Sequence, residues 1–182
     1  MKYDVMIIGS GPGGYVAAVR AAQLGFNTAV VERENLGGIC LNWGCIPTKA
    51  LLKSAQAFNY IKHSADYGVQ IEGSFKADMN AIVDRSRGVS ANMGKGVAHL
   101  MQKNNITVIE GEAKLTADRK VSVNMKDGSG EQLFEADHII LATGARSRNL
   151  PNMPQDGKKI IGYREAMTLR EQPNSMVVVG SG

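Results

Sequence analysis

The sequence predicts an α/β fold in which a doubly wound, largely parallel sheet carries a small antiparallel β insertion. Two observations predict the parallel sheet. Residues 5–8 form a short apolar run that leads through the glycine-rich residues 9–14 into the alanine-rich residues 15–24, a pattern typical of a buried strand, a tight turn and a helix. Residues 28–31 form a second apolar run, which is closed by Glu32. Strand, helix and strand in this order make a βαβ unit with two parallel strands.

Two long helices and a group of short strands are expected next. Apolar residues recur at helical spacing over residues 48–66 and 79–101, although three glycines leave open whether the second helix is continuous. Strands are expected at 106–110, 120–125 and 132–134. These strands would form the antiparallel insertion around an Asp-Gly-Ser-Gly turn.

The last part of the chain predicts a domain boundary. An apolar strand at 138–141 would return to the sheet, and the residues after it are polar and interrupted by prolines. We therefore expect a dinucleotide-binding domain over residues 1–147 and a connector over 148–175. Residues 176–182 repeat the strand and glycine pattern of the N-terminus, which predicts the first strand and a truncated glycine loop of a second dinucleotide-binding domain.

Composition restricts the classes of function. A chain of 182 residues with 43% hydrophobic residues can form one sizeable globular domain. The net charge is +4, but basic residues are mixed with acidic ones, so nucleic-acid binding is not expected. No apolar run approaches the roughly 20 residues that a membrane helix needs. The N-terminus enters a strand directly and leaves no room for a signal peptide, so we expect a cytoplasmic protein.

The glycine-rich turn fits the dinucleotide fingerprint G-x-G-x-x-G. Gly9 lets the strand turn sharply, Gly11 lets backbone N–H groups approach a pyrophosphate, and Gly14 lets the helix pack close to the strand. Glu32 can accept both hydroxyls of an adenosine ribose and would repel a 2′-phosphate, so NADP is not expected here. The alternative is a glycine-rich turn without a ligand. The motif alone does not distinguish FAD from NAD.

The two cysteines of the chain, Cys40 and Cys45, lie in one glycine-rich segment. On a regular helix their Cα atoms would be about 8 to 9 Å apart, so a disulfide bond would require a distorted helix, for which Gly44 supplies the freedom. Three interpretations compete. A metal site would need more ligands than this segment offers, and two unrelated buried thiols would need no partner. We favour the third, a labile catalytic disulfide of the kind found in reducing compartments.

Lys49 lies one helical turn beyond Cys45 and on the same face of the expected helix. Its ammonium group would favour the thiolate of Cys45 electrostatically. Taken alone, Lys49 would be interpreted as a solvated surface lysine.

Together, the glycine fingerprint and the pattern Gly-Gly-x-Cys-x-Asn-x-Gly-Cys-Ile-Pro-x-Lys over residues 37–49 resemble the family of pyridine-nucleotide disulfide oxidoreductases. Within this family, the segments Cys-Leu-Asn and Lys-Ala-Leu-Leu are most similar to the dihydrolipoamide dehydrogenase branch. Ile39, Trp43 and Thr48 depart from the pattern, in which Thr, Val and Ser are familiar at these positions. The departures leave both sulfurs and the lysine unchanged.

The resemblance implies a flavoprotein that oxidises protein-bound dihydrolipoamide to lipoamide and passes the electrons to NAD. It implies that Cys40 is the outer sulfur, which exchanges with the dithiol, that Cys45 is the inner sulfur beside the flavin, and that Lys49 lies near the flavin ring. Family members continue through NAD-binding, central and interface domains, and their His-Glu acid-base pair comes from the partner subunit. The chain is therefore expected to be incomplete for turnover. The alternatives are an FAD-binding fragment without turnover, or another disulfide reductase of the glutathione- or mercuric-reductase type.

The resemblance also implies the cofactors and partners. The fold would be a Rossmann-like FAD-binding domain, and NAD would bind in the following domain. The expected partners are the lipoyl domain or dihydrolipoamide of 2-oxo-acid dehydrogenase complexes and a second copy in a homodimer, with no metal, nucleic acid or membrane. The residues expected to contact FAD are Gly9, Gly11, Pro12, Gly13, Gly14, Glu32, Arg33, Gly38, Cys40, Cys45, Lys49, Gly111, Ala113, Thr143 and Gly144.

Overall fold

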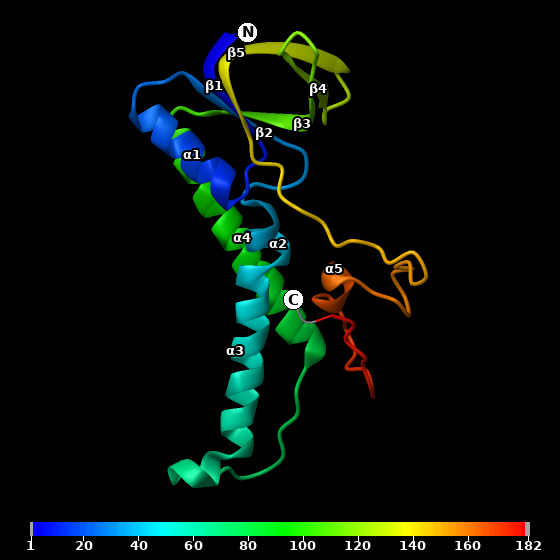
Figure 1. Cartoon of the computed structure of the whole chain (residues 1–182). Helices are drawn as coiled ribbons and strands as arrows, with labels where there is room; N and C mark the ends of the chain where they lie inside the picture. Colours follow the sequence, from blue (N-terminus) through cyan, green and yellow to red (C-terminus); the bar gives the residue numbers. More distant parts are fainter. Residues whose placement is uncertain (1, 181–182) are drawn as a thin grey trace.

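A sheet at one end of the molecule and a long helical hairpin that extends away from it make up most of the computed structural model, which describes residues 2–180 (Figure 1). The predicted βαβ unit is present and consists of β1 (Lys2–Ile8), α1 (Pro12–Gln23) and β2 (Thr28–Glu32). β1 and β2 pair in parallel. The α/β fold class predicted from the glycine-rich turn and its flanking apolar runs is confirmed.

Two strands change partners part-way along their length. β3 (Thr107–Leu115) pairs in parallel with β2 and then antiparallel with β4 (Val121–Met125). β5 (Glu131–Leu141) pairs antiparallel with β4 and then in parallel with β1. The sheet therefore closes into a barrel in the order β1-β2-β3-β4-β5, because β5 returns to β1. The antiparallel insertion is a continuation of the parallel sheet.

The prediction of two separate strands at 132–134 and 138–141 is wrong, because β5 runs through both without interruption. The polar residues between them stay extended because they are exposed on the strand. Glu135 and Asp137 form ion pairs of 2.9 and 2.7 Å with Lys120, just before β4, and with Lys2 in β1. Acidic residues at alternate positions on an exposed strand face, and not a turn, explain the break in the apolar pattern.

Side chains of the sheet alternate between two apolar clusters. On β1, Met6 and Ile8 belong to a cluster inside the barrel, whereas Val5 and Ile7 belong to a second cluster on the outer face, as the two-residue repeat of a strand requires. β4 and β5 complete the cluster inside the barrel, and α1, α2 and α4 complete the outer one. The outer cluster therefore fixes the helices against the carboxyl ends of the parallel strands, where the glycine-rich turn lies.

Four helical segments follow β2 along the chain. They are α2 (Gly38–Trp43), α3 (Cys45–Lys62), the 3-10 helix η1 (Ser64–Tyr67) and α4 (Met79–Lys103). The helix predicted at 48–66 begins three residues earlier and gives way to η1 near its end. α4 is continuous through its three glycines. α3 and α4 lie side by side and form the hairpin seen in Figure 1.

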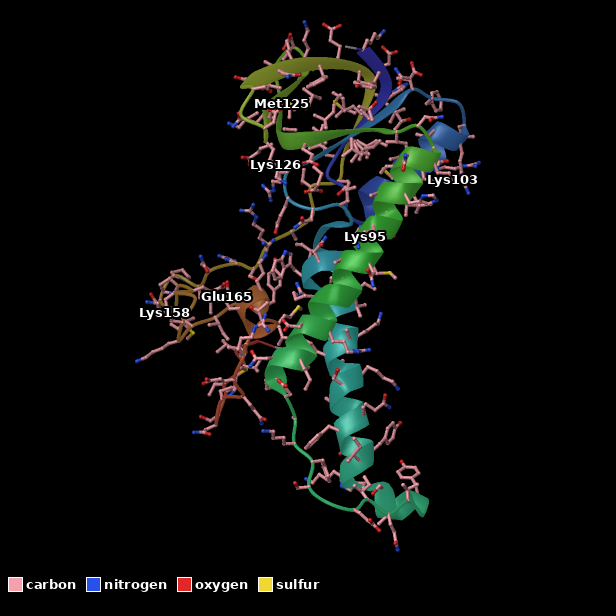
Figure 2. The ribbon with its side chains drawn as sticks, turned by 180° about the vertical axis from the view of Figure 1, so that it is seen from behind. Lys95, Lys103, Met125, Lys126, Lys158 and Glu165 are labelled. Atoms are coloured by element: carbon pink, nitrogen blue, oxygen red, sulfur yellow. The ribbon has the colours of Figure 1, made fainter. Side chains whose placement is uncertain are left out.

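α4 begins with a side-chain cap. The carboxylate of Asp78 accepts a hydrogen bond from the N–H of Ala81 at 3.0 Å, which satisfies one of the free donors at the helix start. The view from behind shows Lys95 and Lys103 on α4, with Lys103 at the end of the helix beside the sheet (Figure 2). Within residues 2–180, no helix is both long enough and apolar enough to cross a membrane.

We expect the substitution Gly88→Ala in α4 to raise the free energy of unfolding by about 0.5 to 1 kcal/mol, because alanine loses less backbone entropy in a helix than glycine. Gly88 is exposed, and a Cβ there would meet no atom within 4 Å. Gly25 offers a matched control, since it also has open space but a φ of +90°. Gly25→Ala should lower the free energy of unfolding by about 1 kcal/mol, because a side chain disfavours a positive φ. Urea denaturation measures both, and a loss of stability in Gly88→Ala would contradict the expectation.

Among the described residues after β5, one short helix, α5 (Tyr163–Ala166), is present. The strand expected within 176–182 is not observed, since residues 176–180 are irregular and Val177 is 88% exposed. A strand gains its ladder hydrogen bonds from a neighbouring strand, and none of the described residues pairs with this segment. The glycine-loop part of that prediction falls on the last two residues, which lie outside the described residues. The division of the chain into three parts stays a prediction.

Candidate functional site

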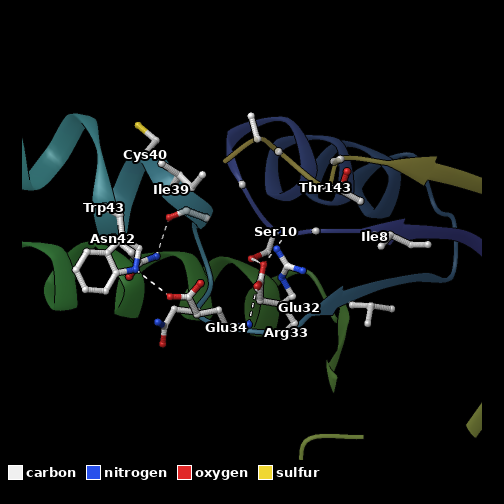
Figure 3. A pocket seen from close by; sticks show the side chains of 18 of the residues that line it. Ile8, Ser10, Glu32, Arg33, Glu34, Ile39, Cys40, Asn42, Trp43 and Thr143 are labelled. Atoms are coloured by element: carbon white, nitrogen blue, oxygen red, sulfur yellow. Dashed lines mark hydrogen bonds between the residues drawn. The ribbon is translucent and has the colours of Figure 1, made fainter. Parts of the chain in front are cut away.

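A cavity of about 400 Å³ lies where the glycine-rich turn, the end of β2, α2 and the loop after β5 meet (Figure 3). Four residues expected to contact the cofactor are not among those that line it, and these are Gly13, Gly14, Cys45 and Lys49. The other expected residues line it, and these are Gly9, Gly11, Pro12, Glu32, Arg33, Gly38, Cys40, Gly111, Ala113, Thr143 and Gly144. The cavity is also lined by residues that the sequence did not single out for a site, among them Ser10, Glu34 and Arg164.

The glycines around the cavity differ in whether backbone conformation or close packing excludes a larger side chain. Gly9 has a φ of +99°, and a Cβ on it would overlap the carbonyl oxygen of Ala142. A Cβ on Gly14 would overlap the carbonyl oxygen of Gly9, and one on Gly38 would lie 2.6 Å from the Cα of Gly11. At Gly11 the nearest protein atom would be 4.0 Å away, so protein packing does not require a glycine there. The free space at Gly11 is on the cavity wall.

The N-terminus of α1 also faces the cavity. Its N-cap residue is Gly11, no side chain caps it, and its first turn holds no acidic residue. The free N–H groups and the partial positive charge of a helix start favour a bound anion such as a pyrophosphate. This end of the cavity is therefore suited to phosphate groups.

Glu32, at the end of β2, is hydrogen-bonded to the glycine-rich turn (Figure 3). Its Oε2 accepts the N–H and O–H of Ser10 at 3.0 and 2.6 Å, and its Oε1 accepts the N–H of Glu34 at 2.8 Å. Ser10 is fully buried, and its hydroxyl oxygen also accepts the N–H of Gly37 at 3.3 Å. Sequence analysis missed Ser10, whose only signal is its position between the first two glycines of the fingerprint. Ser10 fixes the carboxylate of Glu32 and the start of the cysteine segment.

The helix is interrupted between the two cysteines. α2 ends at Trp43, α3 begins at Cys45, and Gly44 between them has φ −146° and ψ −116°. A Cβ on Gly44 would lie 3.3 Å from the Cα of Cys40 and 3.0 Å from the carbonyl oxygen of Ile39. The absence of that Cβ lets the start of α3 approach α2 closely. This is the helix distortion that a bond between the two sulfurs would require.

Both cysteines are thiols in this structure, with Cys40 half-buried and Cys45 exposed. The interaction of Cys40 with Cys45, followed by burial, raises the pKa of the Cys40 thiol, while the charge of Lys49 acts in the opposite direction. Of the two cysteines, only Cys40 lines the cavity. No group of three or more His, Cys, Asp or Glu side chains in the described part of the chain is arranged to hold a metal ion.

Arg164 of α5 forms part of the cavity wall through a bidentate contact. Its Nη1 and Nη2 lie 2.7 and 2.9 Å from the two carboxylate oxygens of Glu34, which also accepts the indole N–H of Trp43 at 2.9 Å. The hydrogen bond from Arg164 is the main cause that lowers the pKa of Glu34, and the same contact raises the pKa of Arg164. The two residues are 130 positions apart, so no local sequence pattern indicates the contact.

This contact predicts an acid-sensitive attachment of α5. The pKa of Glu34 is lower in the folded than in the unfolded chain, so its stabilising effect is complete above the ordinary value of 4.5 and is lost as the pH falls through the lowered folded value. We expect amide hydrogen exchange in residues 163–166 to rise below that pH. The variant Glu34→Gln should lack this pH step, and a pH profile equal to that of the wild type would contradict the assignment.

Comparison with known families supports the same site. The family model described as pyridine nucleotide-disulphide oxidoreductase matches residues 3–182. The chain is similar to dihydrolipoyl dehydrogenase of Rhizobium etli, with 53% identity over 194 aligned residues that cover 100% of this chain and 40% of the relative. It is also similar to the mitochondrial dihydrolipoyl dehydrogenase 1 of Arabidopsis thaliana, with 41% identity over 98% of this chain and 35% of the relative.

A solved structure shares the fold. LpdA from Mycobacterium tuberculosis superimposes with a TM-score of 0.82 at 24% identity, over 94% of this chain and 38% of that chain. The chain therefore spans about 40% of the length of the relatives that it matches.

Proposed function

The chain belongs to the pyridine nucleotide-disulphide oxidoreductase family, and on that premise we propose that it binds FAD in the cavity and carries a redox-active disulfide between Cys40 and Cys45. The protein that contains it would oxidise dihydrolipoamide to lipoamide and pass the electrons to NAD. The observation that carries the proposal is the close approach of the two helices at Gly44, which separates the two cysteines, with Cys40 on the wall of the cavity.

The residues around the cavity fit the ADP half of FAD. The open space at Gly11 and the uncapped start of α1, where Pro12 and Gly13 lie, suit a pyrophosphate. The carboxylate of Glu32 suits the ribose hydroxyls and would repel a 2′-phosphate, although it already accepts three hydrogen bonds from the protein. Of the residues across the cavity, Gly111 and Ala113 would border the adenine, and Thr143 and Gly144 would line the rest of the cofactor.

The thiols would act in two exchange steps. A thiolate of dihydrolipoamide attacks the sulfur of Cys40 in the oxidised pair, which breaks the Cys40–Cys45 bond, forms a mixed disulfide and releases the thiolate of Cys45. The second substrate thiolate then attacks the substrate sulfur of the mixed disulfide. This closes the ring of lipoamide and releases the thiolate of Cys40. The two electrons then reside on the cysteine pair. FAD, when bound, supplies a two-electron acceptor, and Lys49 would stabilise the Cys45 thiolate, although neither side chain lines the cavity in this structure.

The rest of the reaction requires residues beyond these. NAD would bind in a following domain, and a partner subunit would supply the acid-base pair in a homodimer. The dithiol substrate would be the lipoyl group of a 2-oxo-acid dehydrogenase complex, and a redox-active disulfide without a structural role suits a cytoplasmic protein. These assignments are supported by the names of the relatives and by the cysteine segment.

A substrate comparison tests the proposal. The full-length protein should show visible flavin absorption, and dihydrolipoamide should bleach it, whereas glutathione disulfide with NADPH or mercuric ion with NADPH should give no turnover. Oxidation of NADPH by glutathione disulfide or by mercuric ion, without bleaching of the flavin by dihydrolipoamide, would reassign the substrate within the family. Flavin absorption without bleaching by any dithiol would favour the alternative of FAD binding without turnover, which the partial span of the chain supports.

Gly11→Ala should separate cofactor binding from folding. We expect the free energy of unfolding without FAD to stay within about 0.5 kcal/mol of the wild type, because the added Cβ meets no protein atom closer than 4.0 Å. We expect FAD affinity to fall by at least about tenfold, which corresponds to 1.4 kcal/mol. Fluorescence titration of the apoprotein with FAD measures the affinity, with Gly88→Ala as a control. Unchanged FAD affinity in Gly11→Ala would contradict this use of the cavity.

A further inference from the structure

Two guanidinium groups lie over the indole ring of Trp43, at the end of α2. The Cζ of Arg87 is 4.8 Å and that of Arg164 is 4.9 Å from the ring centroid. Arg164 is held in place by Glu34, as described above. Arg87 comes from α4, so the ring of Trp43 is in contact with an element that also packs along α3.

Arg87 also binds the backbone at the end of α2. Its Nη1 donates to the carbonyl oxygen of Asn42 at 2.7 Å. This carbonyl is in the last turn of α2, where backbone oxygens lack partners within the helix, and a basic side chain there satisfies one of them. The side-chain amide of Asn42 in turn donates to the carbonyl oxygens of Leu36 and Gly38 at 3.0 and 2.9 Å. The end of α2 is thus fixed from two sides.

Arg87 is not placed there by hydrogen bonding alone. Its Nε and Nη2 are buried and have no hydrogen-bond partner among the described residues, and burial lowers its pKa. Buried N–H groups without a hydrogen-bond partner lower the stability of the fold. The ring of Trp43 offsets part of that cost, but the position is not one that stability alone would favour.

A second arginine of α4 binds α3 in a similar way. The Nη1 of Arg85 donates to the carbonyl oxygen of Ala50 at 2.9 Å and to the hydroxyl of Ser54 at 3.3 Å. Ala50 lies well inside α3, whereas Asn42 lies two residues before Gly44, where the helix is interrupted. Of the two arginines, only Arg87 therefore binds next to the break that sets the position of one cysteine relative to the other.

We propose that Arg87 is a positioning residue for the cysteine pair, because it fixes the end of α2 so that Cys40 stays in contact with Cys45 on the other side of Gly44. This inference rests on the proposed function, in which the two sulfurs form a reversible disulfide. The stability of such a bond depends on the effective concentration of one thiol at the other. When the end of α2 is released, Cys40 samples positions further from Cys45, and the disulfide becomes easier to reduce.

The reduction potential of the cysteine pair tests this role. Full-length wild type, Arg87→Met, Arg87→Lys and Arg85→Met would be equilibrated with dithiothreitol at several ratios of reduced to oxidised form. Alkylation and mass spectrometry of the peptide with both cysteines then give the oxidised fraction. We expect the ratio of disulfide to dithiol at a fixed dithiothreitol ratio to fall about tenfold in Arg87→Met. This corresponds to a rise of about 30 mV in the reduction potential of the cysteine pair. Arg87→Lys should recover part of this loss, because it keeps one cationic donor, and Arg85→Met should match the wild type.

Each outcome separates the inference from the proposed function. A wild-type potential in Arg87→Met, or an equal shift in Arg85→Met, would overturn the positioning role and leave the redox disulfide in place. A wild type in which no disulfide forms at any ratio would overturn both. If Arg87→Met does not fold, as judged by circular dichroism, the milder pair Arg87→Lys and Arg85→Lys makes the same comparison.

Discussion

In full-length protein, Cys45→Ser is expected to abolish reduction of the flavin by dihydrolipoamide while FAD remains bound. A serine hydroxyl neither forms the disulfide nor accepts electrons from the substrate, so the loss should be on the order of a thousandfold or more. Binding should survive because Cys45 is exposed, does not line the cavity and takes no part in either apolar cluster. Stopped-flow absorbance after mixing with dihydrolipoamide measures the rate, and the visible spectrum of the purified variant measures bound FAD.

Thr48→Ser provides a control for this experiment. It lies in the same helical turn and keeps the hydroxyl that contacts the sulfur of Met167 at 3.9 Å. Its rate of flavin reduction should equal that of the wild type. Loss of FAD or of the native circular dichroism spectrum in Cys45→Ser would mean that the cysteine supports the fold, and would count against its role in electron transfer.

Gly14→Ala, in the glycine-rich turn, is expected to cause a large loss of stability. The new Cβ would overlap the carbonyl oxygen of Gly9, and both groups belong to backbone that cannot move independently of β1 and α1. We expect the free energy of unfolding to fall by about 3 kcal/mol or more, as when a tightly packed site is overfilled. Urea denaturation of the protein without FAD measures the change.

Gly13→Ala is the matched variant for this comparison. Gly13 is the adjacent residue in the same helical turn, and a Cβ there would meet no atom within 4 Å. Its free energy of unfolding should change by no more than about 0.5 kcal/mol. Equal stabilities of the two variants would show that α1 can move away from the turn, and would refute the packing constraint at Gly14.

The local parts of the fold and site could be predicted from sequence because their signals are local. The glycine-rich turn between two apolar runs predicts the βαβ unit, since the positive φ of Gly9 and the close approach of Gly14 to Gly9 are local constraints. The Cys40 and Cys45 spacing likewise predicts an interrupted helix, and the interruption is present at Gly44. In both cases the physical constraint acts between neighbours along the chain.

The long-range parts could not be predicted in the same way. The ion pair of Glu34 with Arg164 and the contact of Arg87 with Asn42 join elements that are distant in sequence, and neither residue type has a distinctive pattern around it. The continuity of β5 was missed for a related reason. Two of its acidic residues interrupt the apolar pattern, and only the fold brings the lysines that pair with them alongside.

The closed order of the strands delays folding of the sheet during synthesis. β1 is synthesised before β5, which ends at Leu141, yet more than half of its backbone pairing is with β5. Contacts between such distant residues require closure of a long loop, whose entropy slows folding. Until β5 emerges, β1 has an unpaired edge that can bind another nascent chain. Folding of this sheet during synthesis is therefore expected to depend on a chaperone.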